Sequence, residues 1–186
     1  MTHAAVQVPG PVAGTWTIDP VHSEVSFTVR HMMVSKVRGT FTEFEGTLHV
    51  AEDLLASSVE ASIAMNSVTT RNEQRDNHIR SADFFEVEKY PTMTYRSTGI
   101  RPDGDRYVIE GELSLHGVTK PVELSTEFVG VSKDPYGNTR SGFSATAEIS
   151  RGDFGIDINL PMDGGGVVVA DRIRIELEIE AILQKG

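Results

Sequence analysis

Apolar and polar residues alternate with a period of two along most of this chain, and this pattern constrains the fold more than any other feature. It is clearest over residues 173–181, where isoleucine, leucine and alanine alternate with arginine and glutamate. Successive side chains of a strand point to opposite faces, so such a segment predicts a strand with one apolar face. The same alternation predicts seven further strands, over residues 25–31, 37–50, 59–65, 93–97, 107–115, 122–128 and 143–149.

Eight strands that each carry one apolar face predict an all-β fold, either a closed antiparallel barrel or a sandwich. Within residues 37–50 the apolar positions change parity, which predicts a bulge near Glu43. A short helical insertion is expected around residues 70–85. Residues 70–80 are polar, lack glycine and proline, and follow Thr69 or Thr70 as the expected N-cap.

Composition excludes several classes of protein. The chain has 186 residues and no cysteine, which excludes disulfides, thiolate nucleophiles and cysteine-based zinc sites. Its formal net charge of -10 argues against a general affinity for nucleic acid. Residues 1–14 are expected to form a flexible arm and residues 15–186 a single domain. The first residues lack a signal-peptide pattern and no segment is apolar enough to span a membrane, so a cytoplasmic location with at most transient membrane contact is expected.

Sequence motifs for catalysis are absent. The chain has no G-x-S-x-G elbow, Walker A loop or H-E-x-x-H pair, so no catalytic residue is predicted. His22, His31, His78 and His116 lie in separate segments and could meet inside a barrel, where imidazole would bind a metal ion. No two of them have the spacing that places ligands side by side, so structural roles are favoured and no metal site is predicted. A histidine-dependent metal-binding protein or enzyme stays an alternative.

The apolar faces of the predicted strands would line the inside of a barrel. Small residues on these faces, such as Gly39, Gly46 and Gly111, would leave space, and methionine adapts to flexible apolar guests. An eight-stranded barrel can be filled by its own side chains or can hold one ligand, and the residue pattern leaves both open. If the interior is hollow, the residues expected to line a tunnel are Phe27, Val29, Phe41, Ile63, Met65, Met93, Tyr95, Leu113, Leu124, Phe143, Ala145, Ile175 and Leu177.

Basic residues near the predicted helix suggest an anion site. Arg71, Arg75 and His78 have the i, i+4, i+7 spacing that would place them on one helix face. Together with Arg38 they could bind the head group of a lipid, such as a phosphate or a quinone oxygen. The alternative is a solvated helix face whose charge is balanced by acidic neighbours.

Several motifs, in order along the chain, resemble one known family. They are GTWTIDPVHSEVSFTVRHMMVSKVRGTF (residues 14–41), RNEQRDNHIRSADFFEVEKYPTMTYRS (71–97), LSLHGVTKPVELS (113–125), and ISRGDFGI followed by VVVADRIRIELEIEA. Together they span nearly all of residues 14–183 and are similar to the YceI-like, polyisoprenoid-binding family. The resemblance implies an eight-stranded, lipocalin-like antiparallel barrel with a helical insertion, whose apolar tunnel holds a polyprenyl chain.

The resemblance also implies a function and roles for individual residues. The expected function is non-covalent binding of an isoprenoid or similar long-chain lipid, as a carrier or reservoir. The bound molecule would be a polyprenyl quinone or a polyprenyl phosphate, and no cofactor is required. A filled barrel that acts through protein contacts, with a homodimer left open, is the remaining alternative. The motif residues that would be structural ties rather than catalysts are Asp19, His22, Ser23, His31, Arg38, His78, Asp83, His116 and Lys120.

Overall fold

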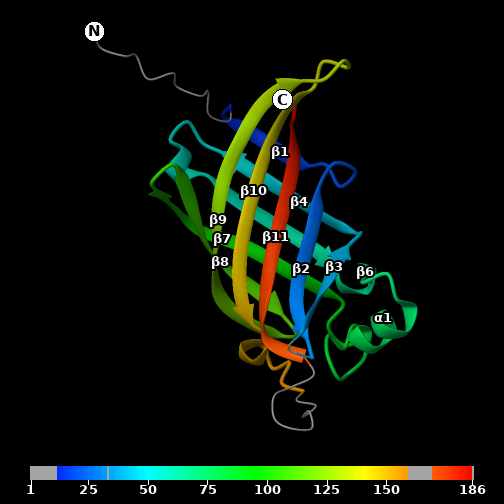
Figure 1. Ribbon diagram of the computed structural model, residues 1–186. Coiled ribbons are helices and arrows are strands. Elements are labelled where there is room, and N and C mark those ends of the chain that lie inside the picture. Colours follow the sequence, from blue (N-terminus) through cyan, green and yellow to red (C-terminus); the bar gives the residue numbers. More distant parts are fainter. Residues whose placement is uncertain (1–11, 33, 159–168, 186) are drawn as a thin grey trace.

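A computed structural model describes residues 12–32, 34–158 and 169–185 of the chain (Figure 1). Strands dominate these residues, as the alternation predicted, and they are joined by one α-helix and short 3-10 helices. In chain order the elements are β1 (Gly14–Ile18), β2 (Glu24–His31), β3 (Ser35–Phe41), β4 (Phe44–Val50), η1 (Leu54–Ala56), β5 (Ser58–Ala64), η2 (Met65–Ser67), β6 (Val68–Thr69), α1 (Glu73–Arg80), β7 (Thr92–Asp103), β8 (Arg106–Leu115), β9 (Val118–Lys133), β10 (Thr139–Ser150), η3 (Arg151–Phe154) and β11 (Val169–Leu183).

The strands form one antiparallel sheet that closes on itself. Around the barrel the order is β1, β4, β5, β7, β8, β9, β10 and β11. Strand β11 then pairs back to β1, where Trp16 lies opposite Leu183 and Ile18 lies opposite Ala181. All of these pairs are antiparallel. The eight-stranded antiparallel barrel expected from the sequence is therefore confirmed.

Strand β11 pairs with two different strands along the same edge. The part from Val169 to Glu178 pairs with β2, and the last part pairs with β1. Strands β2, β3 and β6 therefore continue the wall beside β11, with α1 next to β6 (Figure 1). The change of parity near Glu43 falls between β3 and β4, where the chain changes from pairing with β2 to pairing with β1. The predicted bulge is thus an interruption between two strands.

The end of the barrel beside α1 is filled by aromatic and aliphatic side chains. The ring centroids of Phe27 and Phe41 lie 5.6 Å apart, and that of Phe41 lies 6.2 Å from that of Phe85, in the segment after α1. Met65 is 2% exposed and belongs to the 3-10 helix η2, so its expected place on a strand face is wrong. Phe154 of η3 is equally buried, at 1% exposure. These residues form a packed core that closes this end.

The inner-face glycines do not leave space, contrary to the expectation from the sequence. The ring of Phe27 lies across Gly39, and a Cβ atom added there would come within 2.3 Å of it. The ring of Tyr95 covers Gly111 in the same way, at 2.4 Å, and an aliphatic side chain covers Gly46 at 2.5 Å. A side chain on one strand thus fills the place that a glycine on a neighbouring strand leaves open.

Replacing Gly39 with alanine is expected to lower the free energy of unfolding by about 1–3 kcal/mol, because the added methyl group must displace a ring in a packed region. Gly142 on β10 offers a matched control, since a Cβ atom there would meet Val129 at 3.4 Å, an ordinary contact. Alanine at Gly142 should be neutral or stabilising by up to about 1 kcal/mol. Urea denaturation measures both, and equal losses in the two variants would contradict the packing role of Phe27.

The helical insertion is shorter than expected. Helix α1 begins at Glu73, and its N-cap is Asn72, whose side chain accepts a backbone hydrogen bond from the first turn. Neither Thr69 nor Thr70 is therefore the cap. The residues that follow the helix, 81–89, form turns and bends rather than further helix.

The first strand includes the last residue of the expected N-terminal arm. Strand β1 begins at Gly14, and its pairing with β11 joins the beginning and the end of the barrel region. The rest of that arm lies mostly outside the described residues, which begin at 12. Among the residues that the structure describes, no helix has the length and apolar character needed to cross a membrane.

Candidate functional site: an apolar cavity in the barrel

Next to this packed core, the inside of the barrel holds a partly open cavity of about 190 Å³. Inward side chains of the eight barrel strands form its wall together with one side chain of β2, and η1 contributes Leu54. An apolar protein cavity of roughly 150 Å³ can hold a benzene-sized ligand. The cavity therefore admits an apolar group of that size, and a longer chain must extend through the opening or shift side chains of the wall.

Nine of the thirteen residues expected to line a tunnel lie on this wall: Ile63, Met93, Tyr95, Leu113, Leu124, Phe143, Ala145, Ile175 and Leu177. The other four do not. Phe27, Phe41 and Met65 lie in the packed region, and Val29 lies further along β2 than Val25, which does line the cavity. Alternation identifies the inner face of a strand but not the height along the barrel at which a side chain lies. Ligand contact by the nine wall residues stays a prediction.

The wall also includes residues that were not among those expected. Ile109, Val122 and Ile179 share the inner parity of predicted strands, so the same alternation could have identified them. Leu54 comes from a 3-10 helix, whose short irregular backbone gives no periodic signal.

The wall offers a ligand few polar partners. The hydroxyl group of Tyr95 donates a hydrogen bond to the carbonyl oxygen of Val122 at 2.8 Å, and that of Thr126 donates to the carbonyl oxygen of Leu124 at 3.2 Å. Burial raises the pKa of Tyr95 above its usual value, so the phenol stays protonated and keeps donating. The described residues that line the cavity include no lysine, arginine or histidine. Because an unpaired buried charge is costly, the cavity suits an uncharged part of a ligand.

Two of the basic residues expected to bind a head group lie on the outside of the barrel wall. Arg38 is exposed on β3 and donates a hydrogen bond to Glu24 at 2.8 Å. With Arg71, Thr40 and Thr69 it lines a surface pocket that shares no residue with the cavity. The barrel wall thus separates these arginines from the apolar interior.

The expected alignment of Arg71, Arg75 and His78 on one helix face does not form. Arg71 precedes the helix and has a backbone φ of 62°. Arg75 donates through Nε to the hydroxyl oxygen of Thr70 at 2.7 Å, and His78 Nε2 lies 2.8 Å from Asp83 Oδ2. The structure therefore does not bring the four expected head-group residues together.

The motif histidines have separate partners. His22 Nδ1 donates to Asp19 at 2.7 Å, and His116 Nδ1 donates to the carbonyl oxygen of Phe154 at 3.0 Å. Across residues 12–32, 34–158 and 169–185, one group of three potential metal ligands occurs, and it contains a single histidine, His22. The contacts of His22 and His116 are of the kind expected of structural ties, and within the same ranges the four motif histidines form no common group of ligands.

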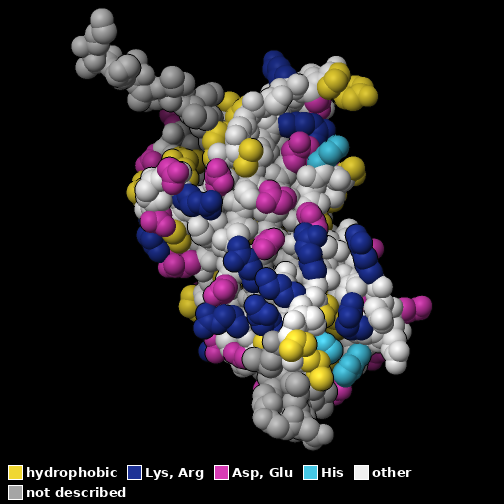
Figure 2. Space-filling view, in the orientation of Figure 1, with side chains coloured by type: hydrophobic (Ala, Val, Ile, Leu, Met, Phe, Trp, Pro, Cys, Tyr) yellow, Lys and Arg dark blue, Asp and Glu magenta, His cyan; other side chains and the backbone are white. Residues whose placement is uncertain are grey.

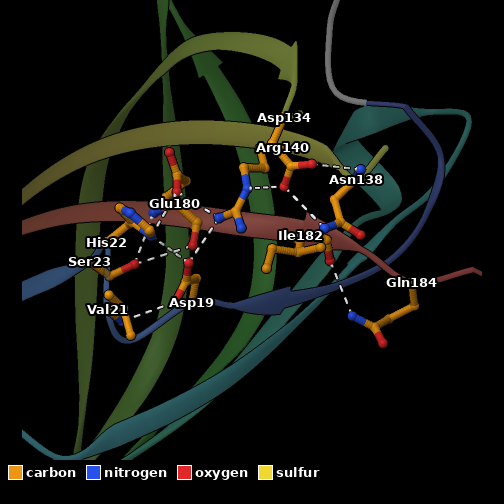
Figure 3. A network of polar contacts seen from close by, with 10 residues as sticks. All are labelled: Asp19, Val21, His22, Ser23, Asp134, Asn138, Arg140, Glu180, Ile182 and Gln184. Carbon is orange, nitrogen blue, oxygen red and sulfur yellow. Dashed lines mark hydrogen bonds and ion pairs between the residues drawn. The ribbon is translucent and has the colours of Figure 1, made fainter. Parts of the chain in front are cut away.

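The group around His22 surrounds Arg140, at the end of the barrel where β11 changes partner (Figure 3). Arg140 donates to Asp19 at 2.8 Å, to Glu180 at 2.9 Å and to Asp134 at 2.8 Å. Burial alone would raise the pKa of Asp19, but hydrogen bonds from His22 and Arg140 outweigh it and lower this pKa to about 2. The guanidinium thus supplies the positive charge that these carboxylates need.

Ser23 completes the backbone hydrogen bonding at the same junction. Its hydroxyl oxygen accepts from the backbone N–H of Glu180 at 3.0 Å, and the hydroxyl group donates to the carbonyl oxygen of Glu180 at 3.2 Å. The backbone N–H of Asp19 also donates to that carbonyl oxygen, at 2.8 Å. These bonds satisfy the backbone of β11 between its pairing with β2 and its pairing with β1. Asp19, His22 and Ser23 are structural ties here.

Arg151 is a structural residue that no sequence pattern indicated. It is 3% exposed, although arginine is rarely buried, and it lies in η3. Its guanidinium donates to the carbonyl oxygens of Ala170 at 3.0 Å, Ile156 at 2.7 Å and Val169 at 2.9 Å. Arg151 thereby fastens the segment after β10 to the start of β11.

Known proteins resemble this chain over nearly its whole length. Residues 16–181 match the YceI-like domain family. Protein YceI of Escherichia coli O157:H7 is 37% identical over 177 residues, which cover 94% of this chain and 90% of that protein. A UPF0312 protein of Pectobacterium atrosepticum is 39% identical over 165 residues, which cover 88% of this chain and 83% of that protein.

Solved structures share the barrel. The YceI protein of Campylobacter jejuni has a TM-score of 0.72 at 29% identity, covering 84% of this chain and 90% of that one. BcnA of Burkholderia cenocepacia has a TM-score of 0.74 at 21% identity, with coverages of 88% and 98%. A polyisoprenoid binding domain from Saccharophagus degradans has a TM-score of 0.66 at 15% identity, with coverages of 91% and 98%. Because the family match extends over most of the sequence, the chain belongs to the YceI-like domain family.

Proposed function

We propose that this barrel binds the hydrocarbon chain of an isoprenoid, or of a similar long-chain lipid, non-covalently, and acts as its carrier or reservoir. The observation that carries the proposal is the cavity, whose wall is apolar and whose described residues include no cation. Membership of the YceI-like family supports it, as does a barrel shared with a domain named for polyisoprenoid binding.

The strands of the wall are long enough to lie along an extended guest. Strand β9 has 16 residues and β11 has 15, so each extends roughly 50 Å at about 3.3 Å per residue. Met93 on the wall can change rotamer to admit a chain longer than the cavity itself. Burial contributes about 0.8 kcal/mol per methylene relative to water. A lipid that leaves a bilayer gains far less, and a small net preference suits reversible loading and release.

The wall also indicates which part of the ligand is buried. A phosphate group inside the cavity would meet none of the lysine, arginine or histidine side chains of the described residues, and its desolvation would be uncompensated. We therefore propose that the head group lies outside the cavity, where a polyprenyl phosphate gains no contact with the wall that a polyprenol or a polyprenyl quinone lacks.

Loading the purified protein with three ligands of equal chain length tests the proposal: a polyprenol, a polyprenyl quinone and a polyprenyl phosphate. Extraction into organic solvent and mass spectrometry should recover the prenol and the quinone in stoichiometric amounts, and the phosphate should bind no more tightly than the prenol. Failure of all three ligands to bind would leave the filled barrel as the better account. Binding of the phosphate more than about tenfold more tightly would contradict the outside position of the head group.

Three expectations from the sequence stay predictions of this proposal. The proposed binding requires no cofactor besides the lipid itself. A cytoplasmic location would be tested by fractionation of cells that produce the protein, and a homodimer by analytical ultracentrifugation.

A further inference from the structure

We propose that the outer face of β2, β3 and the adjoining part of β11 docks on an anionic phospholipid bilayer. This inference rests on the proposed function, since a lipid carrier must collect its cargo from a membrane or deliver it there. The surface is defined by five cations and by Met32 and Val34, which lie between β2 and β3. The cations are Arg30, Lys36, Arg38, Arg172 and Arg174, all of them exposed.

Positive charge gathers on this face although the chain as a whole carries a net charge of -10. Figure 2 shows lysine and arginine side chains concentrated over the lower central part of the molecule, where β11 and β2 run side by side in Figure 1. The pairing of the strands brings the cations together, because Arg174 lies opposite Thr28 and Thr28 lies opposite Arg38. The acidic chain thus has one face suited to an anionic partner.

Arg30 and Lys36 lie directly opposite each other on β2 and β3. Like charges in this position destabilise a sheet. Arg38, Arg172 and Arg174 each form an ion pair with a glutamate at 2.8 to 2.9 Å. Neither Arg30 nor Lys36 has a side-chain ion pair or hydrogen bond within the part of the chain that the structure describes. Two opposed cations without a partner among the described residues offer a binding place to an anionic group.

The hairpin between β2 and β3 adds exposed apolar side chains beside these two cations. Val34 is 82% exposed and Met32 is 37% exposed. Apolar groups next to cations match a bilayer surface, where anionic head groups lie above acyl chains. A nucleic acid would use the cations but would leave the apolar side chains without a partner. The combination therefore favours a bilayer.

The proposed docking surface is the back of the cavity wall. Ile175 and Leu177 of β11 and Val25 of β2 line the cavity, whereas Arg174 and Arg30 of the same strands are exposed. Docking would therefore hold the wall of the lipid cavity against the membrane surface.

Vesicle flotation tests the docking surface in the full chain. The protein should bind vesicles of phosphatidylcholine mixed with phosphatidylserine more tightly than vesicles of phosphatidylcholine alone. Arg30→Gln combined with Lys36→Gln should weaken binding to the anionic vesicles roughly 30-fold, since each removed cation contributes about a fivefold factor. Arg96→Gln combined with Lys133→Gln changes the net charge equally, on exposed positions of β7 and β9, and should change binding less than about threefold.

Val34→Ser separates the apolar contribution from the charge contribution. It should weaken binding to both kinds of vesicle by several-fold and leave the circular dichroism spectrum unchanged. Equal binding of the parent protein to neutral and anionic vesicles, or equal losses in the two double variants, would overturn the docking surface. Binding of duplex DNA without binding of vesicles would overturn the assignment to a bilayer.

Lipid occupancy, measured by extraction in the same preparations, keeps this inference separate from the proposed function. If the double variant at Arg30 and Lys36 loses vesicle binding but keeps the lipid occupancy of the parent protein, the docking surface is distinct from the lipid cavity. If no preparation holds lipid after loading, the proposed function fails, while the comparison of vesicles still decides whether the surface binds anionic bilayers.

Discussion

Replacing Ala145 with tryptophan is expected to lower the amount of bound long-chain lipid about tenfold or more. Ala145 is 7% exposed on β10 and lies on the cavity wall between Thr126 of β9 and Leu177 of β11. An indole ring added there would take up much of a cavity of about 190 Å³. Excluding only two carbons of the guest forfeits roughly 1.6 kcal/mol, at about 0.8 kcal/mol per carbon. Mass spectrometry of the organic extract measures the occupancy.

Thr146→Trp is the matched control, because the neighbouring residue faces the opposite side of β10 and does not line the cavity. It should retain the occupancy of the parent protein. Ala61→Phe narrows the cavity from β5 and keeps the test decisive if the tryptophan variant does not fold. Normal occupancy in folded Ala145→Trp and Ala61→Phe proteins would show that the guest lies elsewhere and would contradict the cavity as the binding site.

The barrel could be predicted because its physical cause is local. One face of each strand is buried and the other is exposed, so the requirement appears as a two-residue period within each segment. The break between β3 and β4 also left a local signal, the change of parity near Glu43. Its interpretation as a bulge was wrong because parity alone does not show that Phe41 and Phe44 belong to strands with different partners.

The extent of the cavity could not be predicted, because it depends on contacts between distant segments. Phe27 and Ile63 both have inner parity, yet only Ile63 lines the cavity. The ring of Phe27 packs on Phe41, and Phe41 packs on Phe85 from a turn after the helix. Glycines were equally ambiguous, because a missing side chain leaves space only if no ring from the next strand covers it.

The predicted alignment of Arg71, Arg75 and His78 was wrong for a reason that is visible in the sequence. The i, i+4, i+7 spacing requires Arg71 to be helical, but Asn72 is as strong an N-cap as any residue and starts the helix after it. The network around Arg140 is different, since Arg140 and Asp19 are 121 positions apart. Only the short-range pair of Asp19 and His22 could have been identified from spacing.

Replacing Arg151 with methionine is expected to lower the free energy of unfolding by about 3–5 kcal/mol. Methionine is similar in length but donates no hydrogen bond, so the three backbone carbonyl oxygens that the guanidinium holds lose this donor at a buried site. The start of β11 would be released from η3, and with it one end of the strand that closes the barrel. Chemical denaturation followed by tryptophan fluorescence suits the test, since Trp16 is fully buried beside β11.

Arg172→Met, on strand β11, provides the control. Its side chain is 77% exposed and forms one surface ion pair with Glu148, so its loss should cost less than about 1 kcal/mol. Arg151→Lys keeps the positive charge but cannot reach three carbonyl oxygens in the planar geometry of a guanidinium, and should fall between the two. A loss at Arg151 no larger than that at Arg172 would show that other contacts hold β11 in place. A lysine variant as stable as the parent would show that charge alone, and not the guanidinium geometry, fastens the strand.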